Sequence, residues 1–372
     1  MEKLDLQKIR EEIDIIDREL ARLFEKRMDI VLKVAEYKRQ NNLPVKDMAR
    51  EEKILAKCET LVENKEYAEG LKKILRDIMD FSCDIQEKEL KKDNKIKFGL
   101  LGKKLGHSIS PKIHKEIFKN LNIDENYSLV ELDENQIENF FKNEIKNYRG
   151  LNVTIPYKIK AMEFMDEISK EAREIGAINT IFQKDGKLYG YNTDYFGFKR
   201  MLEENKIFVN GKNSVVLGAG GGARAVIKYL IDENAKNILI VVRNLEKAKK
   251  ELEDLVKDRK NISFIDFESF EKREEEGYLI VNCTPVGMYP NVDDSPISKE
   301  VSKKYENSVD LIYNPSETKF LKYAKSSEKK SVNGLYMLVA QAVEAEEIWQ
   351  ERKISNEVIK NIMKEELWEY LL

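Results

Sequence analysis

Residues 214–225 have the sequence SVVLGAGGGARA, in which a short β-type run meets a glycine-rich turn and an apolar helical pattern follows directly. In such a turn Gly218 permits the tight bend, and Gly220 lets backbone N–H groups approach a pyrophosphate. Ala223, the third small residue, allows the helix to pack closely on its sheet. Strand, turn and helix in this order predict a dinucleotide-binding domain, with a purely structural turn as the alternative. The expected cofactor-binding residues of the turn are Gly218, Ala219, Gly220, Gly221 and Ala223.

The next predicted strand, residues 237–242, ends in the sequence RNLEK, residues 243–247. At this position a domain that binds NAD offers a carboxylate to the ribose hydroxyls. Here the side chains are Arg243, Asn244 and Lys247, and cations favour NADP. The alternative is a solvated arginine and lysine at the end of a strand.

The composition limits the class of protein. A chain of 372 residues has room for two or three domains, and its 65 basic and 68 acidic side chains give no electrostatic reason to expect nucleic acid. Three distant cysteines and two histidines make neither a disulfide framework nor a zinc site, so we expect no metal and a reduced, cytoplasmic setting. There is no apolar run of about 18 residues, and the charged start, Met1-Glu2-Lys3, lacks a secretory apolar core, so we expect no membrane association.

Beyond residue 95, apolar runs alternate with helical patterns. The strand-like runs cover residues 96–102, 150–155, 214–217, 238–242 and 278–282. Such alternation is the mark of a largely parallel α/β fold. The charged stretch at residues 87–94 contains almost no apolar side chain, and it predicts a domain boundary.

The first 90 residues have an all-α pattern. Residues 6–38 contain no glycine or proline, and their apolar residues recur at three- and four-residue steps or multiples of them, which predicts one long amphipathic helix. We expect a second helix after Asp47 as N-cap and a third from Leu71 to Gln86. Two shorter helices cannot cover a seam of over 30 residues, so we expect a second copy of the chain to complete this core in a homodimer.

Several short motifs flank the glycine turn. Upstream are GHSISP at residues 106–111, NVTIPYK at 152–158, GAINT at 176–180 and NTD at 192–194, and downstream are VDLIYNP at 309–315 and NGLYMLVAQA at 333–342. Each motif alone is an ordinary turn sequence. Together and in this order they resemble shikimate dehydrogenases, over about residues 95–372. The resemblance implies the NADP(H)-dependent, reversible reduction of 3-dehydroshikimate to shikimate.

The residue types suit that reaction. Hydride addition to a ketone creates an alkoxide, which a nearby ammonium can stabilise and protonate. By resemblance this role falls to Lys158, with Asp194 orienting the lysine and sharing the proton relay. The resemblance adds Leu311 and Gly334 to the cofactor side. It implies that uncharged groups bind the substrate, with the two serines on the carboxylate: Ser108, Ser110, Asn152, Thr154, Asn179, Tyr313 and Gln341.

Structural alternatives exist for three of these residues. Ser108 and Ser110 could simply cap a helix that Pro111 opens, and Asp194 could cap the next helix.

The sequence also departs from the family pattern. Lys104 stands where a proline is usual, Lys115 stands where an asparagine is usual, and Val242 replaces an asparagine beside Arg243. None of these changes touches Lys158 or Asp194, but the last leaves NAD open as the alternative cofactor.

The predicted long helix carries cations at a suggestive spacing. Arg27 and Lys38 are eleven residues apart, so on an ideal helix they differ by about 20° in azimuth and roughly 16 Å along the axis. Their long side chains could converge on one small dianion. Arg10 lies about 100° away from Arg27 and would more easily serve the pocket of a partner chain.

Further polar residues follow on the second and third helices: Asp47, Arg50, Glu51, Ser82 and Gln86. Over about residues 4–90 the pattern resembles chorismate mutases of the all-helical class. The resemblance implies that Arg10 of the other subunit, Arg27 and Arg50 meet the two carboxylates of chorismate. It also implies that Lys38 and Gln86 donate to the ether oxygen, that Glu51 with Asp47 nearby holds the ring hydroxyl, and that Ser82 contacts the substrate. The rearrangement to prephenate needs a compact conformer and charge stabilisation, with no nucleophile or cofactor; the alternative is an ordinary solvated charged face.

The sequence therefore predicts a multidomain, bifunctional enzyme of aromatic amino-acid biosynthesis. Its expected parts are an all-α domain at 1–90, a substrate-binding α/β domain at 95–200 completed by helices at 335–372, and a Rossmann-type NADP domain at 201–334. Two alternatives remain. The helical domain could be a non-catalytic module for metabolite sensing and dimerisation, and the dehydrogenase could act on quinate or use NAD.

Overall fold

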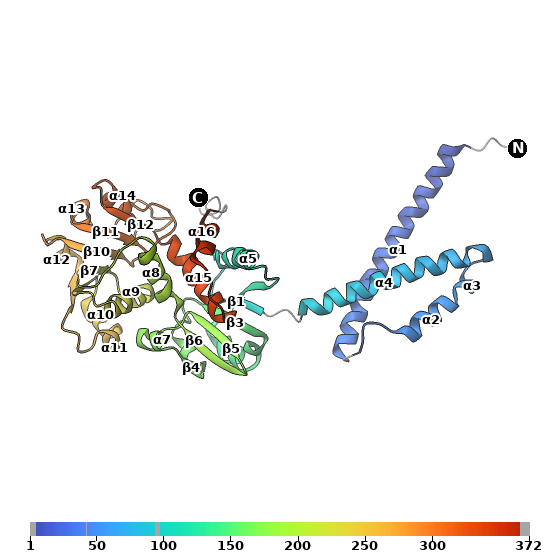
Figure 1. The fold of residues 1–372 in the computed structure, drawn as a ribbon, viewed down its shortest axis with the longest axis horizontal. Coiled ribbons are helices and arrows are strands. Elements are labelled where there is room, and N and C mark those ends of the chain that lie inside the picture. Colours follow the sequence, from blue (N-terminus) through green and yellow to red (C-terminus); the bar gives the residue numbers. More distant parts are fainter. Residues whose placement is uncertain (1–4, 42, 94–96, 365–372) are drawn as a thin grey trace. The chain divides into compact units, whose positions relative to one another are not determined.

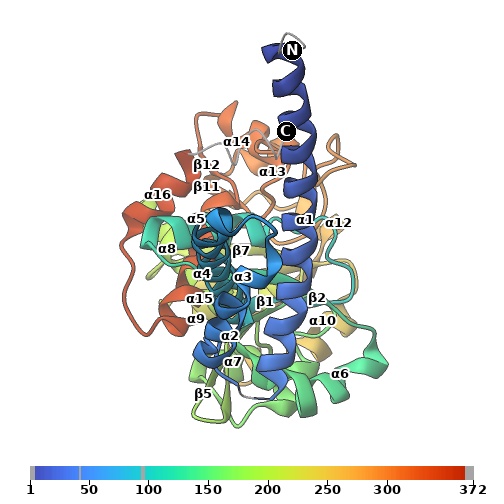
Figure 2. The ribbon, with the colours of Figure 1, turned by 90° about the vertical axis from the view of Figure 1, so that its right-hand side faces the viewer.

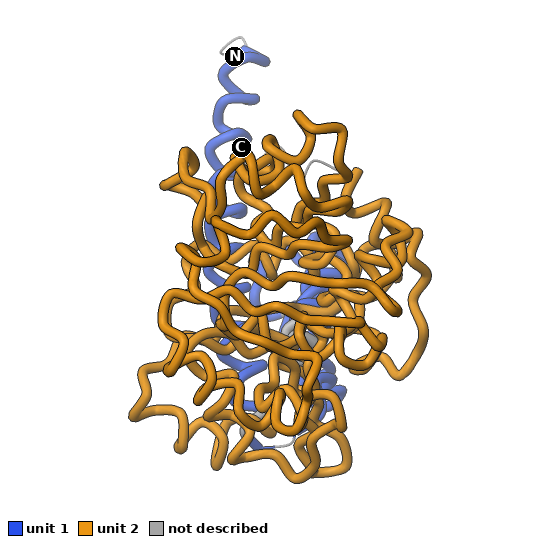
Figure 3. The backbone as a smooth tube through the Cα atoms, turned by 90° about the vertical axis from the view of Figure 1, so that its left-hand side faces the viewer, with its two compact units in different colours: residues 1–95 blue, residues 96–372 orange. Residues whose placement is uncertain are grey.

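The computed structural model describes residues 5–41, 43–93 and 97–364, and the chain forms two compact units, residues 1–95 and 96–372 (Figures 1 and 3). The chain start at Met1-Glu2-Lys3, the first residue of the predicted strand at 96–102 and the last eight residues of the predicted helices at 335–372 lie outside the described residues. Within the described ranges, no helix combines the length and the apolar character that a membrane crossing requires.

The first unit is all-helical, as predicted. Its long helix α1, Leu6–Gln40, is continuous (Figure 2), and it packs on α4, Ala68–Asp93. The side chain of Asp47 caps α2, Met48–Ala56, by accepting a hydrogen bond of 3.1 Å from the backbone N–H of Arg50. Two short segments that the sequence did not predict, α3 (Cys58–Leu61) and η1 (Lys65–Tyr67), lead into α4.

Most of the apolar seam of α1 is uncovered. Val31, Ala35 and Met79 are among the few buried apolar side chains of the unit. Exposed large apolar side chains run along α1, namely Leu6, Ile9, Ile13, Ile15, Ile16, Leu20, Leu23, Phe24, Ile30 and Leu32. The other helices of this unit therefore leave the apolar face of α1 exposed.

The second unit contains two six-stranded sheets. The first has the order β2-β1-β3-β5-β6-β4. Its strands are β1 (Lys97–Gly102), β2 (Asn126–Glu131), β3 (Tyr148–Val153), β4 (Glu167–Ile168), β5 (Thr180–Lys184) and β6 (Lys187–Tyr191). The helical segments of this part are α5 (Ser110–Leu121), η2 (Glu134–Gln136), α6 (Ile137–Asn139), η3 (Phe140–Glu144), η4 (Ile145–Asn147), η5 (Lys160–Phe164), α7 (Lys170–Ile175) and α8 (Thr193–Glu204).

This first sheet is mixed, because β5 runs antiparallel to both β3 and β6. The β5–β6 hairpin closes through Asp185 and Gly186, whose φ angles are 52° and 77°. Two successive positive φ values match the right-handed twist of the strands that they join. The sequence predicted the parallel part of this sheet but not the hairpin.

The second sheet is wholly parallel, with the order β12-β11-β10-β7-β8-β9. Its strands are β7 (Asn213–Leu217), β8 (Asn237–Val242), β9 (Ile262–Asp266), β10 (Gly277–Asn282), β11 (Tyr305–Asp310) and β12 (Lys330–Val332). The helices along these strands are α9 (Gly221–Asp232), α10 (Leu245–Glu251), α11 (Glu253–Val256), α12 (Phe267–Glu271), α13 (Lys299–Ser302) and α14 (Lys319–Lys325). The strand order reverses between β7 and β10, and a doubly wound sheet binds its ligands at the carboxyl ends of the strands at such a point.

The chain then returns to the first sheet through α15, Leu335–Trp349, and α16, Asn356–Lys364. Trp349 is fully buried against Gly150 of β3, and its Nε1 donates a hydrogen bond of 2.9 Å to the carbonyl oxygen of Ile181. α15 also packs on α8, where a Cβ at Gly197 would lie only 2.8 Å from the carbonyl oxygen of Met337. These contacts fix α8 and α15 beside each other.

Candidate active sites

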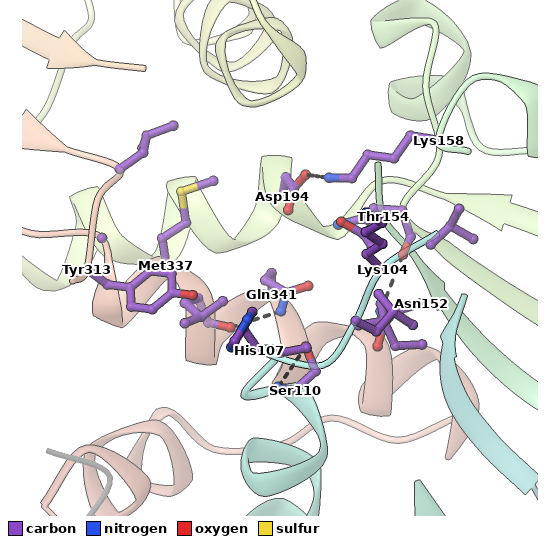
Figure 4. Close-up of a pocket in the computed structure, with 18 of the residues that line it drawn as sticks. Lys104, His107, Ser110, Asn152, Thr154, Lys158, Asp194, Tyr313, Met337 and Gln341 are labelled. Atoms are coloured by element: carbon purple, nitrogen blue, oxygen red, sulfur yellow. Dashed lines mark hydrogen bonds and ion pairs between the residues drawn. The ribbon is translucent and has the colours of Figure 1, made fainter. Parts of the chain in front are cut away.

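A cavity of about 590 Å³ gathers the residues that the sequence assigned to the substrate of the α/β unit. We call it the Lys158 pocket. Its walls come from the β1–α5 segment, the end of β3, the start of α8, the segment after β11 and helix α15 (Figure 4). All nine predicted residues line it, namely Lys158, Asp194, Ser108, Ser110, Asn152, Thr154, Asn179, Tyr313 and Gln341.

Lys158 and Asp194 form an ion pair, with 2.7 Å between Nζ and Oδ2. Lys158 lies in the turn after β3, and its carbonyl oxygen accepts a hydrogen bond of 2.9 Å from the N–H of Ile178. Asp194 lies in the first turn of α8, which Asn192 caps with its side chain. The capping alternative for Asp194 is therefore wrong, and its carboxylate is directed at the ammonium.

The β1–α5 segment brings its two serines to the start of α5. Helix α5 begins at Ser110, and the N–H of Ser110 donates to the Oγ of Ser108 at 3.3 Å. The residue at the N-cap position, Ile109, makes no side-chain cap. Ser108 thus has a local structural role as well as a place in the pocket. The start of α5, where the helix dipole is positive, contributes Ser110 to the same wall.

The side-chain amide oxygens of the buried residues Asn179 and Asn152 both accept hydrogen bonds from the protein. The Oδ1 of Asn179 accepts a hydrogen bond of 2.7 Å from the N–H of Thr193. The Oδ1 of Asn152 accepts one of 2.8 Å from the hydroxyl of Tyr127. Because the carbonyl side of Asn179 is occupied, its NH₂ group is the part that can face a ligand.

Tyr127 is a functional neighbour that sequence reasoning missed. It is buried in β2, hydrogen-bonds to Asn152 and Ser110, and stacks on His114 with 3.9 Å between ring centroids. Nε2 of His114 has no hydrogen-bond partner within the described residues, while Nδ1 lies 2.7 Å from Oε1 of Glu346. The strand pattern of residues 126–131 could have placed Tyr127 inward, but its partners come from distant segments.

The remaining walls of the Lys158 pocket come from the second sheet and α15. Tyr313 follows β11, and burial raises the pKa of its hydroxyl, which therefore stays protonated and able to donate. Gln341 lies on α15, and its Oε1 is 3.4 Å from the Oγ1 of Thr193. Leu311 and Gly334 also line this pocket, and a Cβ at Gly334 would lie 2.1 Å from the carbonyl oxygen of Leu311.

A second cavity, of about 780 Å³, lies at the carboxyl ends of β7, β8 and β10. We call it the Arg243 pocket. Predicted residues that line it are Gly218, Ala219, Gly220, Arg243, Asn244 and Lys247. Gly218 has a φ of 103°, which favours glycine, and a Cβ at Gly220 would meet nothing within 4 Å. An extended pyrophosphate fits this open turn at the start of the 12-residue helix α9.

The other predicted cofactor residues lie elsewhere. Gly221 begins α9, and a Cβ there would meet nothing within 4 Å; Ala223 is a fully buried residue of α9, so its small side chain serves the packing of that helix. Leu311 and Gly334 line the Lys158 pocket instead. In the sheet, β11 and β12 lie beyond β10, and Leu311 and Gly334 follow these two strands. A dinucleotide that extends from Arg243 across Gly218 would therefore end near the Lys158 pocket.

The end of β10 contributes residues to the Arg243 pocket that the sequence did not single out, namely Cys283, Thr284, Pro285 and Val286. Asn282 anchors them: its Oδ1 accepts hydrogen bonds from the N–H and hydroxyl of Thr284, and its Nδ2 donates to Asp310 at 3.0 Å. Burial raises the pKa of Asp310 from 3.8 to about 7. The sequence could have indicated residues 283–286, because they directly follow a predicted parallel strand, where ligands bind in doubly wound sheets.

The helical unit has a pocket of its own, of about 150 Å³, between α1, α2 and α4. We call it the Lys38 pocket. It contains seven of the predicted residues, namely Arg27, Lys38, Asp47, Arg50, Glu51, Ser82 and Gln86. Arg27 donates to the hydroxyl of Ser82, and burial, followed by the neighbouring Arg50, lowers the pKa of Arg27. Two guanidinium groups that face one small cavity suit a ligand with two carboxylates.

Two features of the Lys38 pocket were not predicted. The ammonium of Lys38 donates to the backbone carbonyl of Val45, and the thiol of Cys83 lies 3.9 Å from Oε1 of Glu51. The Oε1 of Gln86 is buried without a hydrogen-bond partner within the described residues. Arg10 is exposed on α1 and is not among the lining residues, so a single copy does not bring it to this pocket.

Three family models match the chain. Residues 9–87 match "Chorismate mutase type II", residues 100–181 match "Shikimate dehydrogenase substrate binding domain", and residues 202–309 match "Shikimate / quinate 5-dehydrogenase".

Individual proteins agree with these matches. A shikimate dehydrogenase (NADP(+)) from Clostridium perfringens is 49% identical over 270 residues, which cover 72% of this chain and 97% of the relative. The crystal structure of a chorismate mutase/shikimate 5-dehydrogenase fusion protein from Clostridium acetobutylicum has 44% identity and a TM-score of 0.67, covering 73% of this chain and 96% of that one. Shikimate 5-dehydrogenase from Thermus thermophilus, solved in complex with NADP(H) and shikimate, has 29% identity and a TM-score of 0.64, covering 73% and 100%.

Proposed function

The chain belongs to the shikimate dehydrogenase family and has a type II chorismate mutase domain in front of it, and from this premise we propose two separate active sites, the Lys158 pocket and the Lys38 pocket. It is an enzyme of aromatic biosynthesis that uses NADP. The observation that carries the proposal is the 2.7 Å pair of Lys158 and Asp194 in a pocket that Leu311 also lines, and the side chain of Leu311 would lie 3.1 Å from a Cβ at Gly222 of the glycine turn.

In the dehydrogenase site, the residues of the Arg243 pocket would hold NADP(H), with Arg243 and Lys247 toward the 2′-phosphate. When bound, the cofactor supplies or accepts the hydride. The ammonium of Lys158 donates a hydrogen bond to the ketone oxygen of 3-dehydroshikimate and gives it a proton as the alkoxide develops. Asp194 orients that ammonium through their 2.7 Å ion pair, and Ser108 and Ser110 with the start of α5 receive the substrate carboxylate.

In the mutase site, Arg27 and Arg50 would pair with carboxylates of chorismate, while Lys38 and Gln86 donate to the ether oxygen. Glu51, with Asp47 nearby, would hold the ring hydroxyl, and Ser82 would contact the substrate. The pocket thus favours the compact conformer and the charge separation of the rearrangement, in which a C–O bond breaks and a C–C bond forms within the substrate and no covalent bond to the protein is made.

We also propose that the mutase unit works as a homodimer through α1. The exposed apolar side chains of α1 form a face that a second copy can cover, since monomers seldom leave such a long apolar patch in water. Arg10 is 17 residues from Arg27, or about 26 Å along the helix axis, so it does not serve its own pocket. A two-fold axis near residues 18–19 of α1 would bring the partner subunit's Arg10 level with Arg27.

The domain limits form part of the proposal: a mutase domain at 1–90, a substrate domain at 95–200 with helices from 335–372, and an NADP domain at 201–334. We further propose that the protein works in the cytoplasm, because Cys58, Cys83 and Cys283 are free thiols.

The test is a paired assay of one purified protein. We expect NADPH-dependent reduction of 3-dehydroshikimate, and separately the conversion of chorismate to prephenate without any cofactor. Quinate and NAD, assayed beside shikimate and NADP, should give lower kcat/KM values. Absence of chorismate turnover would favour the alternative of a non-catalytic helical module.

A further inference from the structure

We infer that Lys104 is a second cationic group of the dehydrogenase site and contributes to its specificity for a substrate with a free carboxylate. This rests on the Lys158 pocket being the dehydrogenase site. Lys104 belongs to the segment between β1 and α5 and lines the pocket, on the wall beside Asn152 and Thr154 (Figure 4).

The charge balance of the pocket points to this role. Its formally charged lining side chains are Lys104, Lys158 and Asp194. Asp194 is paired with Lys158 at 2.7 Å, and within the described residues no carboxylate pairs with Lys104. Two ammonium groups minus one carboxylate leave a formal charge of +1, which a substrate with one carboxylate would neutralise. A cleft with one excess sign of charge concentrates ligands of the opposite sign.

The other charged groups near this segment are already held. Lys103 points its ammonium at Asp133, at 3.9 Å, and it does not line the pocket. Oε1 of Glu131 accepts a hydrogen bond of 2.5 Å from the N–H of Leu105, so that carboxylate is held by the backbone next to Lys104. Of the two neighbouring lysines, Lys104 is therefore the one whose ammonium can interact with a ligand in the pocket.

The position of Lys104 also suits the proposed carboxylate site. Three residues separate it from Ser108 on the same segment, which ends at the N-terminus of α5. The serine hydroxyls and the helix terminus offer hydrogen bonds and partial charge but no full positive charge. A mobile ammonium at the pocket wall adds long-range attraction that hydroxyl groups cannot give.

The experiment compares Lys104→Gln with the matched control Lys103→Gln in the full chain. Shikimate and its uncharged methyl ester are oxidised with NADP at low and high salt. For Lys104→Gln we expect KM for shikimate to rise roughly three- to tenfold at low salt, which corresponds to the loss of one partly solvated ion pair. KM should also depend less on salt than in the unaltered enzyme. KM for the methyl ester should stay within about twofold, because the ester lacks the charge that Lys104 attracts.

Lys103→Gln should leave both KM values unchanged, and Lys104→Arg should restore most of the preference for the acid. The inference is overturned if Lys104→Gln changes KM for acid and ester equally, or changes neither at low salt. Failure of the unaltered enzyme to oxidise shikimate is a different result, since that would reject the dehydrogenase site itself. An unchanged kcat with the methyl ester and an unchanged thermal unfolding midpoint by circular dichroism report that the dehydrogenase unit of each variant is folded.

Discussion

The Nε of Arg224 donates a hydrogen bond of 2.7 Å to the carbonyl oxygen of Ile175. Arg224 lies in the first turn of α9, directly after the glycine turn, and Ile175 ends α7. Two residues beyond Gly176, the N–H of Ile178 donates to the carbonyl oxygen of Lys158 at 2.9 Å. One guanidinium therefore links the cofactor turn to the segment that holds the proposed proton donor.

We predict that Arg224→Leu raises KM for both NADP and shikimate, with kcat/KM for shikimate falling about tenfold, the effect of a small misplacement of reacting groups. Arg173→Gln, which alters an exposed arginine of α7, serves as the control. Steady-state kinetics with each substrate varied in turn provide the measurement. A change confined to NADP would mean that the link does not reach Lys158.

The two activities should separate by single substitutions. We predict that Lys158→Ala lowers dehydrogenase kcat by about 10³-fold or more and spares mutase activity, because the developing alkoxide loses its proton donor. Lys38→Ala should do the reverse. The exposed Lys160→Ala and Lys33→Ala provide controls with the same chemistry. Loss of both activities in either variant, with the fold intact by circular dichroism, would contradict separate sites.

Arg243 should set the choice of cofactor. Arg243→Gln removes a cation beside the proposed 2′-phosphate position, so KM for NADP should rise about ten- to a hundredfold while KM for NAD changes little. Lys249→Gln, on the same helix as Lys247 but outside the pocket, is the matched control. Equal effects on NADP and NAD would assign Arg243 to another part of the cofactor.

The stability of the second unit should depend on pH through Asp310. Burial raises its pKa to about 7, although hydrogen bonds from Thr318, Ile312 and Asn282 lower it. The native state then keeps a proton that the unfolded chain releases, and the contribution of this group to stability falls as pH rises from about 4 to 7. The substitution Asp310→Asn should therefore lower the free energy of unfolding by less at pH 8 than at pH 5. The difference should be about 3 kcal/mol, because it builds up over the two pH units between pH 5 and the pKa of about 7.

Urea unfolding followed by circular dichroism at the two pH values measures this difference. Asp266→Asn is an informative comparison, because the hydrogen bond from the N–H of Ser269 lowers the pKa of that carboxyl. Its pH dependence should have the opposite sign and lie at lower pH. A cost of Asp310→Asn that stays constant or grows toward pH 8 would show that the carboxyl is already ionised in the native state.

The proposed dimer predicts complementation between inactive chains. Arg10→Ala and Lys38→Ala should each abolish most mutase activity. After the two proteins are mixed and allowed to exchange subunits, about half of the dimers contain one of each, and each of those has one intact site of two. About a quarter of the normal activity should return. If Arg10 served its own chain, mixing would restore nothing.

The sequence allowed the architecture and the positions of the site residues to be predicted, because motifs and periodicity are local. The glycine turn, the cap at Asp47 and the long α1 follow from neighbouring residues, and the structure has them. The contacts that hold the sites together were not predictable in this way. Tyr127 reaches Asn152 across 25 residues, and His114 reaches Glu346 across 232, so only the folded sheet brings these pairs together.

The return of α15 to the first sheet affects the order in which a growing chain can become active. Trp349 is synthesised 168 residues after Ile181, and Gln341 is synthesised 148 residues after Thr193, the residues that they contact. A nascent polypeptide would expose the face of β3 at Gly150 until α15 leaves the ribosome, whereas the helical unit has all its residues much earlier. Premature termination between residues 95 and 335 would thus yield a product that contains its whole first unit, while the oxidoreductase part remains unfinished and a target for proteolysis.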